Sequence, residues 1–238
     1  MTLQHDQSED FRLQGHLLID YLADYLKSCN SSTLPVTTPI PPDSSYHYWE
    51  NILSNNSLPL QDLFRDIVSK SIHLHHPGYV GHQVATSHPS GILADLIAST
   101  LNNGMAVYEM GQVSIAMEKA ICAMLTNAIG WGADATGFFT SGGTLANLTA
   151  LLSARQIYSK SKYWYEGHAT SKYAVMVSTE AHYCIERAVK IMGLGNEGII
   201  HIPINTDFKI DISQLENIYQ SSSNKGLEIF AFVANAGS

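Results

Sequence analysis

Charged side chains are scarce in this sequence, and positive ones are the scarcer kind. Only 14% of the 238 residues are Asp, Glu, Lys or Arg, against about 25% in an average soluble domain. Lys and Arg number 13 against 21 Asp and Glu, a net charge of −8, which excludes a nucleic-acid binder driven by phosphate contacts. Since 45% of the residues are hydrophobic, a disordered tail is excluded. Much of the surface is expected to be buried, against a second copy or against further chain.

Long hydrophobic runs and paired cysteines are also missing. No apolar stretch approaches the roughly 20 residues that cross a bilayer, and residues 1–10 are too polar and acidic for a signal peptide. Cys29, Cys122 and Cys184 are far apart and form no Cys-x-x-Cys pair, which argues against a disulfide framework or a zinc ribbon. We expect a cytoplasmic protein with ordinary, partly buried thiols and no membrane contact.

The first third of the chain is predicted to be helical but interrupted. Residues 8–28 carry apolar side chains at helical spacing, and residues 31–46 hold four of the eight prolines among many Ser and Thr residues. This indicates a helix followed by an extended linker. A short helix is expected at 60–71, and residues 75–83 have no period, which is typical of an ordered loop.

From residue 90 onward the pattern becomes that of an α/β domain. Two helices, 92–101 and 113–128, precede a regular alternation of strands and helices, which predicts a largely parallel sheet. The predicted strands are 136–140, 173–178, 199–204 and 227–234, and the helices between them are 144–158, 183–192 and 213–220. A capping box, Ser213 with Glu216, is expected to open the last helix. Because residues 229–234 are apolar at consecutive positions, the last strand is predicted to be central and covered on both faces. It would then lack a covering helix, so we expect the front part of a longer protein.

The most informative local feature is a glycine turn, residues 141–144, between a predicted strand and a predicted helix. Free backbone N–H groups, the helix dipole and the hydroxyls of Ser141 and Thr144 point at one spot there, and Gly142 and Gly143 let an anion come close. This arrangement is typical of a phosphate site. An ordinary strand-to-helix turn with a threonine cap explains the residues equally well.

A second feature, His182, lies just after a predicted strand and at the start of the next helix. Ligands of open parallel sheets collect at the carboxyl ends of the strands, so this imidazole can lie against a planar ligand held by the glycine turn. A histidine that only begins a helix is the commoner case.

Five histidines cluster between residues 73 and 88, but they do not have the spacing of a metal site. Acidic partners at ligand spacing and the His-Glu-x-x-His pattern are both missing. Structural or substrate-lining imidazoles are therefore favoured over zinc ligands. The residues are His73, His75, His76, His82 and His88.

Three segments taken together resemble one enzyme family. They are TSGGTLANLTALLSAR at 140–155, AHYCIERA at 181–188 and HPGY at 76–79. In order and spacing they are similar to the group II pyridoxal-phosphate-dependent amino acid decarboxylases, a family that includes the glutamate, tyrosine, aromatic amino acid and diaminobutyrate enzymes. The likeness extends over about residues 69–238.

The resemblance implies roles for five residues. The backbone at Gly143 and the side chain of Thr144 would bind the phosphate of pyridoxal 5′-phosphate (PLP), and His182 would be the catalytic group that stacks on its pyridine ring. His82 and Gln83 would face the amino acid substrate.

The resemblance also implies an architecture. It is the aspartate aminotransferase-like fold (PLP fold type I), an α/β fold whose members are homodimers with the active site at the subunit interface. Residues 1–85 would be a helical segment wrapping the partner, and residues 86–238 the front part of the PLP-binding domain.

The chain departs from the family pattern in one respect. The family's aspartate on the ring nitrogen and its His-Lys pair, whose lysine bonds the cofactor, lie further along, and none of the nine lysines present follows a histidine. We therefore expect the front part of an amino acid decarboxylase, inactive without the remainder. The alternative is a truncated, catalytically inactive product that acts as a binding or assembly module. Transamination or carbon–sulfur cleavage on the same fold is disfavoured by the group II motif.

Overall fold

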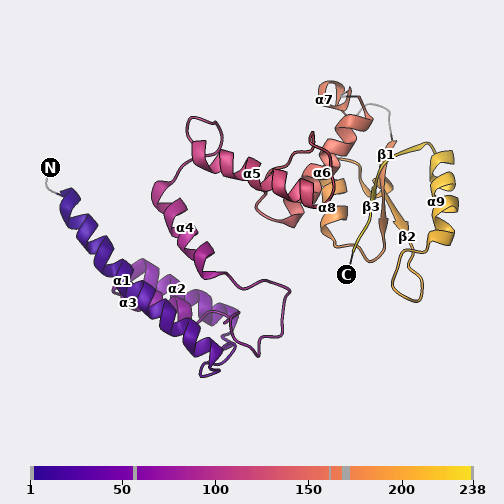
Figure 1. Ribbon diagram of the computed structural model, residues 1–238. Helices are drawn as coiled ribbons and strands as arrows, with labels where there is room; N and C mark the ends of the chain where they lie inside the picture. The colour runs from indigo at the N-terminus through magenta and orange to yellow at the C-terminus, as the bar shows by residue number, and fades with distance from the viewer. Residues whose placement is uncertain (1–2, 56–57, 161, 168–171, 237–238) are drawn as a thin grey trace. The chain divides into compact units, whose positions relative to one another are not determined.

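The computed structural model describes residues 3–55, 58–160, 162–167 and 172–236 (Figure 1). The chain forms two compact units, residues 1–103 and 104–238. The boundary predicted after residue 85 differs from this division, because the loop and helix that follow residue 85 belong to the first unit. None of the helices in the described ranges is long and apolar enough to cross a membrane.

The first unit is helical, as predicted. Its helices are α1 (Leu3–Asn30), α2 (Pro42–Asn55), α3 (Leu60–Ser69) and α4 (Pro89–Leu101). The predicted linker at 31–46 is wrong in its second half, because α2 already begins at Pro42. Proline is compatible with the first turn of a helix, where its missing N–H has no partner to lose, and Asp43 complements the positive helix end.

A polar contact joins α2 to α3. The Tyr48 hydroxyl donates to the carboxylate of Asp66, and Lys70 Nζ lies 2.7 Å from Asp66 Oδ1. The Lys70 ammonium also lies 4.5 Å from the centroid of the Tyr48 ring. Hydrogen bonds from Lys70 and then Tyr48 lower the pKa of Asp66, so the carboxylate is held ionised between the two helices.

The segment after α3 contains neither helix nor strand between residues 75 and 83, as predicted. It is fastened by His73, which is 3% exposed and whose Nδ1 lies 3.2 Å from the Tyr25 hydroxyl of α1. Burial lowers the pKa of His73. His76 Nδ1 accepts from Gly78 N, and His88 Nδ1 accepts from Ser90 N at the start of α4. Three of the clustered histidines thus have structural hydrogen bonds.

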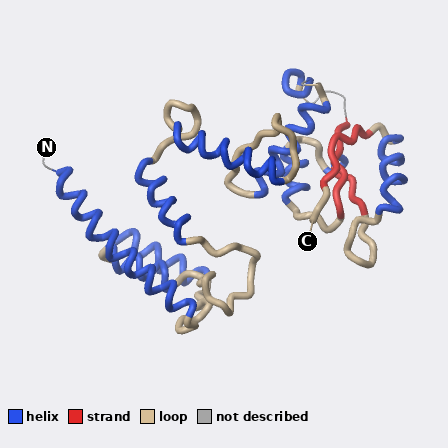
Figure 2. Tube along the Cα trace, in the orientation of Figure 1, coloured by secondary structure: helices blue, strands red, loops and turns tan. Residues whose placement is uncertain are grey.

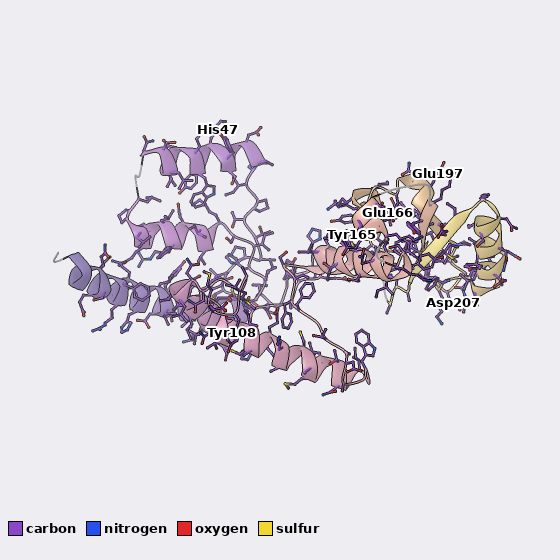
Figure 3. The ribbon with its side chains drawn as sticks, turned by 90° about the horizontal axis from the view of Figure 1, so that it is seen from above. His47, Tyr108, Tyr165, Glu166, Glu197 and Asp207 are labelled. Carbon is purple, nitrogen blue, oxygen red and sulfur yellow. The ribbon has the colours of Figure 1, made fainter. Side chains whose placement is uncertain are left out.

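The second unit is an α/β layer structure with a parallel sheet, as predicted (Figure 2). The sheet has three strands in the order β2-β1-β3. Its elements are α5 (Gln112–Ala128), α6 (Gly143–Tyr158), α7 (Lys162–Glu166), β1 (Lys172–Ser178), α8 (Cys184–Ile191), η1 (Asn196–Gly198), β2 (Ile199–Ile202), α9 (Ile212–Asn224) and β3 (Leu227–Val233). In the side-chain view, Tyr165 and Glu166 lie on α7, and Asp207 lies in the loop between β2 and α9 (Figure 3).

Helices cover both faces of the sheet. Val175 and Val177 of β1 pack with α6 and α8, whereas Ala174 and Met176, at the alternate positions, pack in the cluster that includes α9. Successive strand residues point to opposite faces, so a strand covered on both sides is apolar at every position. In the structure this strand is β1.

The last strand, β3, is predicted to be central but to lack a covering helix, and in this part of the chain it is partly open. Its central position stays a prediction. β3 pairs with β1 and lies at the edge of the described sheet. Most of its side chains are only half-buried, and Phe232 is 46% exposed. β1 and β3 are both apolar, yet this part of the chain covers both faces of β1 and leaves β3 partly exposed.

The strand predicted at residues 136–140 is also absent, because no strand in the described ranges pairs with this segment. Instead the Phe139 N–H donates to Glu118 Oε1 of α5 at 2.8 Å. The Glu118 carboxylate thus accepts a backbone N–H that would donate to a neighbouring strand if this segment were part of a sheet.

The start of α9 differs from prediction as well. Asp211 is its N-cap and accepts from Ser213 N at 3.0 Å, while Ser213 lies inside the helix. The predicted capping box of Ser213 and Glu216 is therefore wrong. A carboxylate that accepts from Ser213 N and from the Ser213 hydroxyl binds both donors more strongly than a neutral cap does.

Candidate functional site

The glycine turn opens helix α6 as the sequence indicates. Leu145 N and Ala146 N both donate to Gly142 O at 3.1 Å, so Gly142 is the N-cap and Gly143 the first helical residue. Gly142 makes no side-chain cap, and Thr144 lies within the first turn. The alternative of a turn closed by a threonine cap is therefore not what forms.

The space in front of this helix start is open. A Cβ atom built on Gly142 or Gly143 would meet nothing within 4 Å, and Ser141 and Thr144 are exposed. The first N–H groups of a helix have no partner within it, and the helix dipole makes this end positive. A phosphate group therefore fits here, with backbone N–H groups and two hydroxyls within its reach.

The start of α8 is fixed next to the start of α6. Asn147 Nδ2, in the first turns of α6, donates to Cys184 Sγ, the first residue of α8, at 3.2 Å. Below this contact the two helices share an apolar cluster that includes Leu148, Leu151 and Ile185. Two positive helix ends are thereby brought to one edge of the unit.

His182 lies at this edge, between the carboxyl end of β1 and α8. Its Nδ1 accepts from Cys184 N at 3.2 Å, so the neutral imidazole carries its proton on Nε2. The side chain is exposed, and its ring centroid lies 4.2 Å from that of Tyr183. His182 therefore orients the helix start and also presents an imidazole ring to solvent. The start of α6, which carries Gly143 and Thr144, and the start of α8, which follows His182, are thus joined through Asn147 and Cys184. The roles of Gly143, Thr144 and His182 in cofactor binding stay predictions.

His82 and Gln83 belong to the first unit, in the loop before α4, and both are exposed. The backbone carbonyl of His82 accepts from the Tyr79 hydroxyl at 3.2 Å and from Val84 N at 2.9 Å, so this part of the loop has a defined conformation. Their role in facing a substrate stays a prediction.

Sequence reasoning missed three residues that shape the site: Asn147, Cys184 and Glu118. Cys184 was expected to be an ordinary thiol, but it is 2% exposed and accepts the Asn147 amide. Asparagine is a weak helix former, so its presence early in α6 was a signal of a partner outside the helix. The partners of Asn147 and Glu118 are distant in sequence and have no periodic signature.

No group of three or more His, Cys, Asp or Glu side chains in the described part of the chain is arranged to hold a metal ion.

Comparisons with a family model and with curated proteins point to the same family. The model of the pyridoxal-dependent decarboxylase conserved domain matches residues 42–238. The aromatic-L-amino-acid decarboxylase of Bacillus atrophaeus is 28% identical over 234 residues, which cover 97% of this chain and 47% of that protein.

Solved structures share the fold. The glutamate decarboxylase domain of diaminobutyrate-pyruvate transaminase and L-2,4-diaminobutyrate decarboxylase from Vibrio parahaemolyticus aligns with a TM-score of 0.82 at 22% identity, over 93% of this chain and 50% of that one. The Oryza sativa TDC with PLP aligns with a TM-score of 0.78 at 20% identity, over 98% of this chain and 51% of that one. The predicted aspartate aminotransferase-like fold is confirmed, and the chain spans about half the length of the proteins it matches.

Proposed function

Because the chain belongs to the pyridoxal-dependent decarboxylase family, we propose that the protein carrying it removes the carboxyl group of an L-amino acid with PLP as cofactor. The observation that supports this most directly is the open, positive start of α6 beside the exposed His182. Neither feature alone distinguishes a cofactor site from ordinary helix starts. Their juxtaposition matches a ligand with a phosphate at one end and a flat ring at the other.

PLP, when bound, supplies a protonated pyridine ring that accepts the charge left behind by departing carbon dioxide, which no side chain does. The chain's own residues would bind the cofactor and orient it. Gly143 N–H and the Thr144 hydroxyl would donate to the phosphate, and the helix dipole would stabilise its charge. His182, whose imidazole is held by the Cys184 N–H, would lie against the ring and keep its plane fixed. His82 and Gln83 are proposed to face the amino acid.

The test uses the complete encoded polypeptide, purified without cofactor, recharged with PLP and offered aromatic, acidic and diamino L-amino acids. We expect stoichiometric release of carbon dioxide and amine from at least one class. After borohydride reduction, mass spectrometry should find PLP on one lysine outside residues 1–238, because none of the nine lysines within them follows a histidine. Release of a keto acid without carbon dioxide would instead show transamination. PLP binding without turnover of any amino acid would favour the alternative of a binding or assembly module.

We further propose that the protein is a homodimer. Helix α5 exposes Val113, Met117 and Met124, at 71%, 58% and 71%, and large apolar patches on soluble proteins usually mark interaction surfaces. The low charge content of the chain supports the same idea. Met117→Lys with Met124→Lys should shift the mass measured by sedimentation from dimer to monomer, whereas Lys119→Ala on the same helix should not. A monomeric unmodified protein at micromolar concentration would contradict the proposal.

A further inference from the structure

We propose that Glu118 of α5 is a positioning residue for the glycine turn, which it holds through the backbone of Phe139. The inference rests on the proposed function, because the turn matters as a phosphate site only if the protein binds PLP. It assigns to α5 a part in cofactor binding without any contact between α5 and the cofactor.

The contact is direct and bridges distant parts of the chain. Glu118 Oε1 accepts from Phe139 N at 2.8 Å, across 21 positions of sequence. Further along the same segment, the Thr140 hydroxyl donates to Gly142 O at 3.0 Å, and Gly142 O in turn accepts the first N–H groups of α6. Two hydrogen bonds, linked by the backbone between Phe139 and Thr140, therefore connect the carboxylate to the start of the helix.

The segment needs such an anchor because other forces on it are weak. No strand of the described sheet pairs with residues 136–140. Phe138 and Phe139 are 60% and 56% exposed, so their side chains are poorly packed. An N–H bonded to a carboxylate is held more strongly than one bonded to a neutral acceptor.

One face of α5 is shaped to receive the segment. Cys122 lies one helical turn after Glu118, and its Sγ would be 3.5 Å from a Cβ atom at Gly137. Thr126 follows at the next turn, and both side chains are buried, at 7% and 8% exposure. Packing by Cys122 and hydrogen bonding by Glu118 together set the path of the chain into the glycine turn.

The Glu118 carboxylate and a bound phosphate would not compete for the same hydrogen-bond donors. Glu118 accepts the Phe139 N–H, while the phosphate would accept N–H groups of the turn itself. Hydrogen bonds weaken steeply when donor and acceptor are misaligned, so a small displacement of residues 139–142 is enough to weaken phosphate binding.

The test compares Glu118→Ala, Glu118→Gln and Lys119→Ala in the complete encoded polypeptide. PLP affinity is measured by titrating the apo-protein, and exchange of the Phe139 amide by hydrogen–deuterium exchange. Glu118→Ala should raise the PLP dissociation constant about five- to thirty-fold, in keeping with the loss of a charge-assisted hydrogen bond, and should accelerate exchange at Phe139. Glu118→Gln retains an oxygen acceptor of the same reach but loses the negative charge, so its PLP dissociation constant should rise less than that of Glu118→Ala. Lys119→Ala should change neither quantity.

Thr144→Val, measured in parallel, separates this inference from the proposed function. Weaker PLP binding in Thr144→Val but not in Glu118→Ala would overturn the positioning role alone. Unchanged binding in both variants would reject the glycine turn as the phosphate site. Failure of Glu118→Gln to restore binding would also overturn the inference, because the acceptor oxygen would then not be what matters. If Glu118→Ala does not fold, Glu118→Asp replaces it, since its shorter carboxylate should fold but reach Phe139 poorly and weaken PLP binding.

Discussion

Replacing Gly143 with proline and Thr144 with valine together is expected to weaken PLP binding by about two to four orders of magnitude. The pair removes one backbone N–H and one hydroxyl from a charged oxygen, each worth about 1.5 to 3 kcal/mol. The helix itself should survive. Gly143 is the first residue of α6 and a Cβ there meets nothing within 4 Å, and proline is well accepted at this position after an extended residue such as Gly142.

Spectroscopic titration of the apo-protein with PLP measures this effect. The matched control is Thr149→Val, the same chemical change further along α6, where the hydroxyl donates to Leu145 O within the helix. It should leave PLP affinity unchanged. Equal affinities for the double variant and the control would remove the glycine turn from the cofactor site.

Replacing His182 with alanine is expected to lower kcat about ten- to hundred-fold while PLP affinity falls less than about fivefold. The phosphate contacts stay, but the ring plane is no longer fixed against an imidazole. Initial rates of carbon dioxide release, set beside the PLP titration, give both quantities. Turnover close to that of the unmodified protein would mean that His182 only begins a helix.

Two further variants separate the roles of this residue. His182→Asn retains an acceptor for the Cys184 N–H but has no ring, so it should keep thermal stability and lose turnover. His182→Phe has a ring but no acceptor, so it should retain more turnover than His182→Ala and lose stability. The reverse pattern would show that the hydrogen bond to Cys184 N, rather than the ring, is what turnover needs.

The parts of this structure that depend on local chemistry were predictable from sequence. The alternation of strands and helices, the helix start at Gly142 and Gly143, and the place of His182 after β1 follow from periodicity and from the glycines. The contacts that hold them were not predictable. The hydrogen bonds from the Asn147 amide to Cys184 and from Phe139 N to Glu118 form only once the helices have packed.

The predictions that failed did so for a related reason. Residues 136–140 read as a strand because extended, apolar segments usually pair, but pairing needs a neighbour that no local pattern reveals. Asp211, rather than Ser213, caps α9 because its carboxylate accepts from three donors: Ser213 N, the Ser213 hydroxyl and Gln214 Nε2.

The order β2-β1-β3 has a consequence for synthesis on the ribosome. Both strands that flank β1 follow it in the chain, and the later one ends at Val233. The apolar run of β1 therefore emerges before either neighbour, and its β3 side stays unpaired until residues up to Val233 are translated, at about 5 to 20 residues per second. Parallel pairing across such separations is slow, so the nascent chain should depend on chaperones that shield β1 during this interval.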